Sequence, residues 1–175
     1  VQAVVSAAQQ IAMGDSRLAL AGGAESMSRG AYLLPPQARN GVRMGDVNVQ
    51  DLTLGILSDP FGSGHMGCTA ENIAKQYGLS REQLDQFALE SHQKAARAIA
   101  EGRFHDQIVA VEVSRGKQTV LFSRDEHVRD GVQLSDLARL KPAFQKDGMV
   151  TAGNASGIND GAATLVLAHA DEATQ

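Results

Sequence analysis

The run VTAGNASGINDGAA, from Val150 to Ala163, is the most informative stretch of this 175-residue sequence. Glycine recurs in it at every fourth position among small and polar residues, and an apolar run over 162–168 follows. Because glycine lets a backbone come close to another group, the run favours a loop whose main chain contacts a polar ligand. An ordinary glycine-rich connection into a strand explains the same residues. The run by itself leaves both interpretations open.

The composition is that of a globular protein, with 43% hydrophobic and 21% charged residues. The formal net charge is −4 and the sequence contains no long basic block, so the electrostatic pattern of nucleic-acid or anionic-membrane binding is missing. No apolar stretch approaches the roughly 20 residues of a transmembrane helix. We therefore predict a cytoplasmic protein without nucleic-acid or membrane partners.

Cys68 is the single cysteine, which excludes an internal disulfide and a multi-cysteine zinc site. The five histidines stand singly along the chain, so we expect no metal. Cys68 with the nearby His65 suggests a thiol nucleophile, but a small apolar thiol at a helix start is the more common use of such a residue. His65 has two interpretations as well, an acid–base group or a hydrogen-bonded wall residue.

Periodic apolar residues predict a helix over 1–13 and another that begins at Thr69 and ends before Gly78. Ser80, followed three residues later by glutamine, matches a capping box and starts a long helix that Gly102 ends. The predicted apolar face of this long helix contains Leu84, Phe87, Ala88, Ser91, Ala95, Ala98 and Ile99.

Strands are predicted at 17–21, where Gly22-Gly23 follows, and at 163–168. The alternating valines of 109–113 and the run 119–122 predict a hairpin. Ser135 is the predicted cap of a short helix.

Taken together, several segments resemble the thiolase family, and within it the acetyl-CoA acetyltransferases and short-chain β-ketothiolases. The matching segments are LALAGGAESMS, RMGD, HMGCTAENIAKQYGLSREQLDQFALESHQKA, GRFHDQIV, LARLKPAF and VTAGNASGINDGAA. They occur in the order and spacing of the family and extend over the whole chain.

The resemblance implies an α/β protein with part of the five-layered αβαβα thiolase fold. Residues 1–25 would belong to the N-terminal thiolase domain, 26–150 to the inserted loop domain, and 151–175 would return to the N-terminal domain. It further implies that Leu18–Ala21 and Ala163–Ala168 pair in one sheet.

The resemblance also implies an activity for a longer parent protein. Thiolases cleave 3-ketoacyl-CoA with a thiol, or run the reverse Claisen condensation, through an acylated cysteine; acetoacetyl-CoA is the substrate we expect first. The family's cysteine-bearing loop, its Asn-Glu-Ala-Phe and Gly-His-Pro segments and its second cysteine are not among these 175 residues. We therefore expect an internal fragment with no catalytic residue of its own. Coenzyme A and acetyl-CoA would be substrates, with no tightly bound cofactor.

The residues that the resemblance assigns to a function line a coenzyme A channel. Those matching the pantetheine arm are Leu57, His65, Met66, Leu140, Phe144, Ala152, Gly153, Ser156 and Gly157, and Arg129 matches a position near the nucleotide. Pantetheine is thin and carries two amides, so apolar walls with a few fixed polar groups suit it. Without the family, Met66 and Phe144 fit a hydrophobic core equally well.

Asp136 departs from some relatives, which have serine near the nucleotide end of coenzyme A. A carboxylate there would repel phosphate unless it turned to solvent or paired with Arg129 or Arg139.

A second hypothesis for the function is a non-catalytic module that binds coenzyme A or forms oligomers. In the family, part of the loop domain joins subunits into tetramers. The arm Tyr32–Asp46 is the segment that we expect to do so in a homo-tetramer here.

Overall fold

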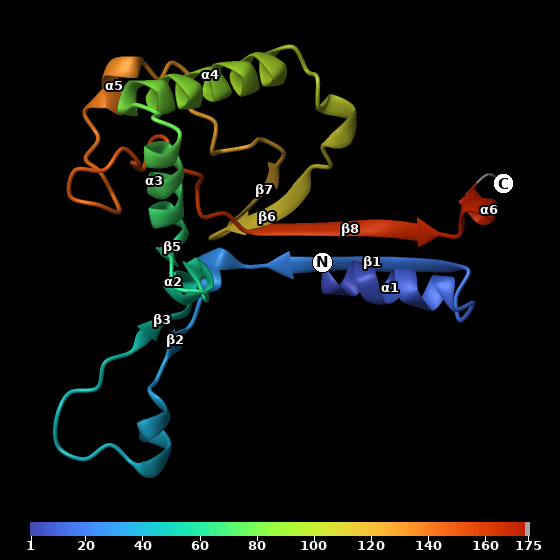
Figure 1. The fold of residues 1–175 in the computed structure, drawn as a ribbon. Helices are drawn as coiled ribbons and strands as arrows, with labels where there is room; N and C mark the ends of the chain where they lie inside the picture. The colour runs from blue at the N-terminus through green and yellow to red at the C-terminus, as the bar shows by residue number, and fades with distance from the viewer. Residues whose placement is uncertain (174–175) are drawn as a thin grey trace. The chain divides into compact units, whose positions relative to one another are not determined.

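The computed structural model describes residues 1–173, drawn as a ribbon in Figure 1. The chain forms two compact units. Unit 1 consists of Val1–Ile56 together with the described residues from Ile158 onward, and unit 2 of Leu57–Gly157. The family-based domain boundaries at residues 25 and 150 stay a prediction, and the last two residues of the third predicted segment lie outside the described residues.

Unit 1 contains a long two-stranded ribbon, helices and a small second ribbon. Its elements are α1 (Gln2–Ala12), β1 (Leu18–Glu25), β2 (Tyr32–Leu33), β3 (Gln50–Asp51), α2 (Leu52–Ile56), β8 (Gly161–Ala168) and α6 (Ala170–Ala173), with 3₁₀ helices at Met27–Arg29 and Pro36–Asn40.

Unit 2 is mainly helical and carries one hairpin. Its elements are β4 (Ser58–Asp59), β5 (Gly64–His65), α3 (Met66–Gln76), α4 (Arg81–Ala100), β6 (Val111–Arg115), β7 (Gln118–Phe122) and α5 (Leu134–Ala138), with a 3₁₀ helix at His105–Gln107.

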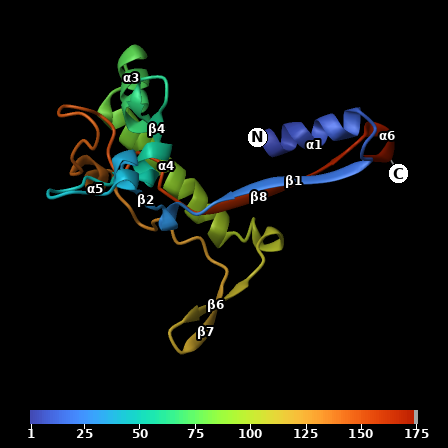
Figure 2. The same ribbon diagram turned by 90° about the horizontal axis from the view of Figure 1, so that it is seen from below.

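Strands β1 and β8 pair antiparallel over their full length, from Leu18 opposite Ala168 to Glu25 opposite Gly161. Helix α1 lies along this ribbon in both Figure 1 and Figure 2. The predicted pairing is confirmed. The predicted strand end before Gly22 is wrong, because β8 is long enough to give the backbone of Gly22, Gly23 and the next two residues a partner.

Helix α4 starts with the predicted capping box. The Ser80 backbone N–H donates to Gln83 Oε1 at 2.8 Å, and the Gln83 N–H donates to Ser80 Oγ at 3.3 Å. The helix ends at Ala100, and Gly102 takes a left-handed φ of +68° just beyond it. Local sequence therefore defines both ends of this element.

The predicted apolar face of α4 is only partly right. Asp85 and Leu89 are its buried residues, whereas Phe87 is exposed. The reason is that the segments packed on α4, among them α5 and the turn at Asn154, lie on the side of Asp85.

Two other helices start earlier than predicted. Helix α3 begins at Met66 instead of Thr69, because the His65 side chain caps it. Helix α5 is capped by Gln133 instead of Ser135, and Asp136 completes that capping box.

The predicted hairpin is confirmed, with Val111 opposite Phe122 and Arg115 opposite Gln118. Gly116 in its turn has a φ of +65°, a backbone conformation that favours glycine. Within residues 1–173, no helix is long and apolar enough to span a membrane.

Candidate functional site

His65 is the first residue that shapes the candidate site. It precedes α3 with extended backbone, and its Nδ1 accepts a hydrogen bond of 3.0 Å from the Gly67 N–H. The ring nitrogen acts as a hydrogen-bond acceptor in this contact, which holds the imidazole at the first turn of α3. The Leu57 carbonyl accepts a hydrogen bond of 2.8 Å from the Met66 N–H, so Leu57 joins the same corner.

Phe144 packs against this corner from a distant part of the chain. Its ring stacks on the His65 imidazole with centroids 4.8 Å apart and planes inclined by 21°. A Cβ added to Gly67 would lie 2.4 Å from three atoms of the Phe144 ring. The glycine at this position therefore allows the ring to lie against the first turn of α3, while the Met66 side chain next to it is 59% exposed.

Glu71, one turn further along α3, holds the start of the glycine-rich run. The residue is 3% exposed. Its Oε2 accepts from the Met149 N–H at 2.9 Å and its Oε1 from the Val150 N–H at 2.8 Å. Both carboxylate oxygens are thus satisfied by backbone donors, as a buried carboxylate requires.

The run itself forms a compact turn around the fully buried Thr151. The Thr151 N–H donates to Asn154 Oδ1 at 2.8 Å, and the Gly153 N–H donates to Thr151 Oγ1 at 3.2 Å. The Thr151 carbonyl accepts from the N–H groups of Asn154 and Ala155. Side chains of the run therefore satisfy its own backbone, and the turn presents Ala152 to solvent.

Leu140 lies against this turn. A Cβ added to Gly153 would lie 2.5 Å from Leu140 Cδ1 and 2.8 Å from Leu137 Cδ2. Gly153 is therefore needed for close packing of the turn on the end of α5. Nearby, the half-buried Gly157 accepts a hydrogen bond of 3.2 Å from the exposed Ser156 hydroxyl.

Arg129 lies apart from these groups. Its side chain is exposed, and its backbone N–H donates to His92 Nδ1 at 3.3 Å. His92 is eleven residues beyond Arg81 on α4, about 16 Å along the helix axis at 1.5 Å per residue. Since Arg81 contacts the Leu140 carbonyl, the predicted nucleotide residue stands well away from the predicted pantetheine wall.

The predicted residues thus form three groups within unit 2. Leu57, His65, Met66 and Phe144 meet at the start of α3; Leu140, Ala152 and Gly153, with Ser156 and Gly157 following, meet at the end of α5; and Arg129 stands alone beside α4. Glu71 connects the first two groups because its helix carries Gly67 and its carboxylate holds Val150.

Cys68 and Asp136, which the sequence also singled out, both lie at the start of a helix. Cys68 is half-buried in the first turn of α3. Asp136 accepts a hydrogen bond of 3.0 Å from the Gln133 N–H and so caps α5. The carboxylate that departs from some relatives is thereby used at a helix start, where its charge is favourable.

Sequence reasoning assigned no role to Glu71, Arg81 or Asp85. Asp85 is 2% exposed and bonds to Arg81, its neighbour one turn earlier, at 2.8 Å. The available signal was an acidic residue within an otherwise periodic helix, four positions after an arginine.

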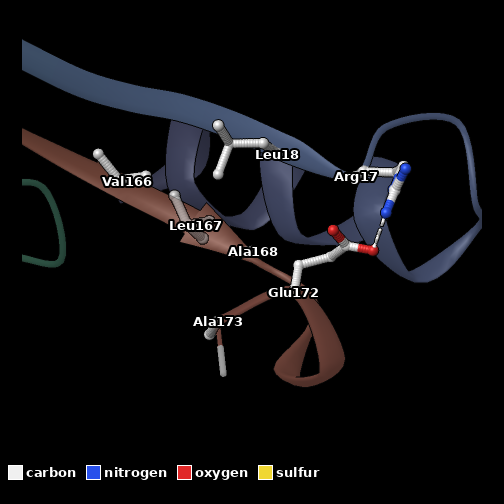
Figure 3. A pocket seen from close by; sticks show the side chains of 7 residues that line it. All are labelled: Arg17, Leu18, Val166, Leu167, Ala168, Glu172 and Ala173. Atoms are coloured by element: carbon white, nitrogen blue, oxygen red, sulfur yellow. Dashed lines mark hydrogen bonds and ion pairs between the residues drawn. The ribbon is translucent and has the colours of Figure 1, made fainter. Parts of the chain in front are cut away.

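Two hollows in the structure lie elsewhere. One, in unit 1, is drawn in Figure 3, where Leu18 and Leu167 face it beside the ion pair of Arg17 and Glu172. The other lies between the second half of α4 and residues 124–130. Neither is lined by a predicted site residue. No three histidine, cysteine, aspartate or glutamate side chains gather as metal ligands would in the part of the chain that the structure describes.

Helix on ribbon in one unit and helices around a buried polar turn in the other define a mixed α/β protein. Comparison with known proteins then assigns the chain to a family. A sequence model of the thiolase N-terminal domain matches residues 1–171. Beta-ketothiolase BktB of Cupriavidus necator is 55% identical over 174 residues, which cover 98% of this chain and 44% of that protein.

Comparison with solved structures leads to the same kind of protein. The crystal structure of Bacillus anthracis acetyl-CoA acetyltransferase matches with a TM-score of 0.87 at 46% identity, covering 99% of this chain and 44% of that one. Human mitochondrial 3-ketoacyl-CoA thiolase in complex with CoA matches with a TM-score of 0.86 at 38% identity, covering 99% and 43%.

The chain therefore belongs to the thiolase family and has part of the thiolase fold. The family and the fold predicted from sequence are confirmed. The chain spans less than half the length of these relatives.

Proposed function

We propose that this chain is the coenzyme A-binding part of a thiolase-type acyltransferase. The whole protein would cleave short 3-ketoacyl-CoA thioesters, acetoacetyl-CoA first among them, or form them by Claisen condensation, through an acylated cysteine. Membership of the thiolase family over residues 1–171 carries the proposal. It is supported by the 55% identity to a β-ketothiolase and by the likeness to a thiolase that was solved with CoA.

We infer that the pantetheine arm contacts the corner of His65, Met66 and Phe144 and the turn at Gly153. The chemistry supports this role, because an exposed methionine and an aromatic ring offer apolar walls, while the neighbouring Ser156 hydroxyl offers a polar contact to an amide. His65 fits a wall residue, since its Nδ1 accepts the Gly67 N–H and its ring stacks on Phe144.

The activity test compares the product of the complete reading frame with the 175-residue chain alone. We expect the former to consume acetoacetyl-CoA in the presence of coenzyme A. We expect the latter to show no turnover, because the nucleophile and the proton-handling residues of the family are not in this sequence. Turnover by the 175-residue chain alone would contradict the proposal. Coenzyme A binding without turnover by the complete product would favour the non-catalytic module.

The site test uses two phenylalanines of unit 2. We expect Phe144→Ala to raise the KM for coenzyme A by about tenfold, since removing an aromatic contact to the ligand costs on the order of 1–2 kcal/mol of binding. Phe87→Ala, at an exposed ring on α4, is the matched control and should leave KM unchanged. Equal KM values for the two variants would remove Phe144 from the site.

We further propose that the complete protein is a cytoplasmic homo-tetramer and that the arm Tyr32–Asp46 contributes to its assembly. The support is the apolar surface that the arm exposes at Leu34, Val42 and Met44. Met44→Lys should shift the sedimentation of the complete product toward smaller species, and an unchanged profile would argue against this use of the arm.

A further inference from the structure

Arg81, at the start of α4, holds the end of α5. Its Nε donates to Asp85 Oδ2 at 2.8 Å, and its Nη2 donates to the carbonyls of Leu137 at 2.7 Å and Leu140 at 3.0 Å. One planar guanidinium thus joins a carboxylate of its own helix to the last carbonyls of another segment. The main chain that carries Leu140 is fixed by this side chain.

Asp85 holds the glycine-rich turn with its other oxygen. Oδ1 accepts from Asn154 Nδ2 at 2.8 Å, and the same amide nitrogen donates to the Met149 carbonyl at 3.0 Å. Asn154 Oδ1 in turn accepts the Thr151 N–H. The Asn154 amide is therefore used on both sides, and the turn has a defined position relative to α4.

The two supports meet at the contact between Leu140 and Gly153. This contact is so close that no side chain fits at Gly153. Arg81 positions Leu140 and Asn154 positions Gly153, and Asp85 links the two supports. A change in any of the three polar side chains would alter the spacing of the two segments.

We propose that Arg81, Asp85 and Asn154 are positioning residues that set the affinity for coenzyme A. They fix the wall that carries Leu140 against the wall that carries Gly153 and Ser156, so that the pantetheine arm meets a preformed surface. This inference rests on the function proposed above. None of the three residues needs to touch the ligand, and none takes part in the chemistry.

A purely structural role of the three residues predicts a change in stability without a change in the affinity of the folded protein for coenzyme A. Removing one partner of a buried ion pair destabilises a fold whether or not the pair also positions a ligand site, so a melting temperature does not separate the two roles. If the three residues strengthen ligand binding equally in the ground state and the transition state, substituting them should raise the dissociation constant for coenzyme A. The turnover number should then stay nearly constant. The test therefore measures both quantities.

Asn154→Ser is the first variant, made in the product of the complete reading frame. Serine is too short to reach Asp85 from this turn, while the ion pair of Arg81 and Asp85 is kept. We expect the dissociation constant for coenzyme A, measured by calorimetry, to rise about tenfold, because Asn154 loses its bonds to Asp85 and to the Met149 carbonyl and the turn is no longer fixed to α4. The kcat for acetoacetyl-CoA cleavage at saturating coenzyme A should stay within about twofold. Glu90→Gln, in an exposed ion pair with Lys94 on the same helix, is the matched control and should change neither.

A reversed pair provides the second test and stands in for the first if Asn154→Ser does not fold. Asp85→Asn puts an amide nitrogen where Asn154 also presents one, so the single variant should bind coenzyme A more weakly. Adding Asn154→Asp lets the new amide at position 85 donate to the new carboxylate at position 154. We expect the double variant to bind more tightly than Asp85→Asn alone, although the bond to the Met149 carbonyl is lost.

The results that would overturn the inference are specific. They are an unchanged dissociation constant for coenzyme A in the folded variants, a fall in kcat with no change in affinity, or a double variant that binds no better than Asp85→Asn. If the unsubstituted protein neither binds coenzyme A nor cleaves acetoacetyl-CoA, the proposed function itself fails. The unsubstituted protein therefore distinguishes the two failures.

Discussion

At the scale of single residues, the glycine-rich run is held by side chains from two helices. Glu71 lies 79 positions before its partner Val150, and Asp85 lies 69 positions before Asn154. Such contacts have no signature in local periodicity, which explains why the sequence pointed to the run without showing what fixes it. Asn154, by contrast, stood out as a polar residue within the run itself.

Glu71→Gln tests the first of these supports. The amide would present a donor to the N–H of Met149 or Val150, so one buried bond is lost and a donor is left unsatisfied. We expect the free energy of unfolding to fall by about 1–3 kcal/mol, measured by urea denaturation of the complete product. Glu112→Gln, at an exposed position of β6, should change it by less than about 0.5 kcal/mol. Similar losses in both variants would contradict the importance of the buried carboxylate.

Gly67→Ala tests the contact with Phe144. Alanine is the better helix former by about 1 kcal/mol, yet its Cβ would meet the Phe144 ring and force it away from His65. We expect a net loss of about 1–2 kcal/mol in the free energy of unfolding. Gly55→Ala in α2 is the matched control, because its Cβ has an ordinary 3.5 Å contact with Gln50 Nε2, and it should be neutral or stabilising. A stabilised Gly67→Ala variant would show that the ring moves at no cost.

At the scale of elements, sequence reasoning succeeded where the decisive contacts are local. The capping box of α4 and the hairpin turn at Gly116 are each fixed by residues a few positions apart. It failed at the start of α3, because an imidazole nitrogen is an uncommon helix cap, and on the buried face of α4, where a polar network replaces apolar packing. The pairing of β1 with β8 came from the family resemblance, since the partners lie 136 to 150 positions apart in the sequence.

Hydrogen bonds between Ser28, in the turn after β1, and Asp160, just before β8, are sensitive to acid. Asp160 accepts hydrogen bonds from the Ser28 hydroxyl at 2.6 Å and the Ser28 N–H at 2.8 Å, and these bonds hold the pKa of its carboxyl below the ordinary value of 3.8. Since the folded-state pKa is the lower one, these bonds stabilise the fold at pH values above the ordinary pKa. The stabilisation is lost as the pH falls through the folded-state pKa.

The Ser28 amide resonance, followed by NMR from neutral to acidic pH, should therefore shift with a midpoint below 3.8. Asp160→Asn should abolish this titration. Asp46 is a control carboxylate for which Asp46→Asn should leave the Ser28 titration unchanged. A Ser28 midpoint at or above the ordinary aspartate value would argue that the bonds do not persist in solution.

At the scale of the whole molecule, many large apolar side chains of the described residues are exposed, among them Leu20, Met66 and Val166. The buried apolar side chains within residues 1–173 are Ala7, Ala21, Ala74, Leu89, Leu137 and Val150, of which three are alanines. The order of the motifs along the chain predicted the thiolase family. It did not predict how much of its apolar surface the folded chain buries.

This surface predicts how the 175-residue chain behaves alone. Leu20 and Val166 are paired across the β1–β8 ribbon, and their side chains are 72% and 70% exposed. Apolar ribbon surface of this kind promotes association, so we expect the isolated chain to form oligomers in sedimentation and to bind a hydrophobic dye. Replacing both residues by threonine keeps the β-propensity and should reduce association. In the complete product we expect further chain to cover the pair, so the same double substitution should there lower the free energy of unfolding, by about 2 kcal/mol or more. A monodisperse monomer with a sharp cooperative melt, obtained from the unsubstituted 175-residue chain, would show that this surface needs no cover.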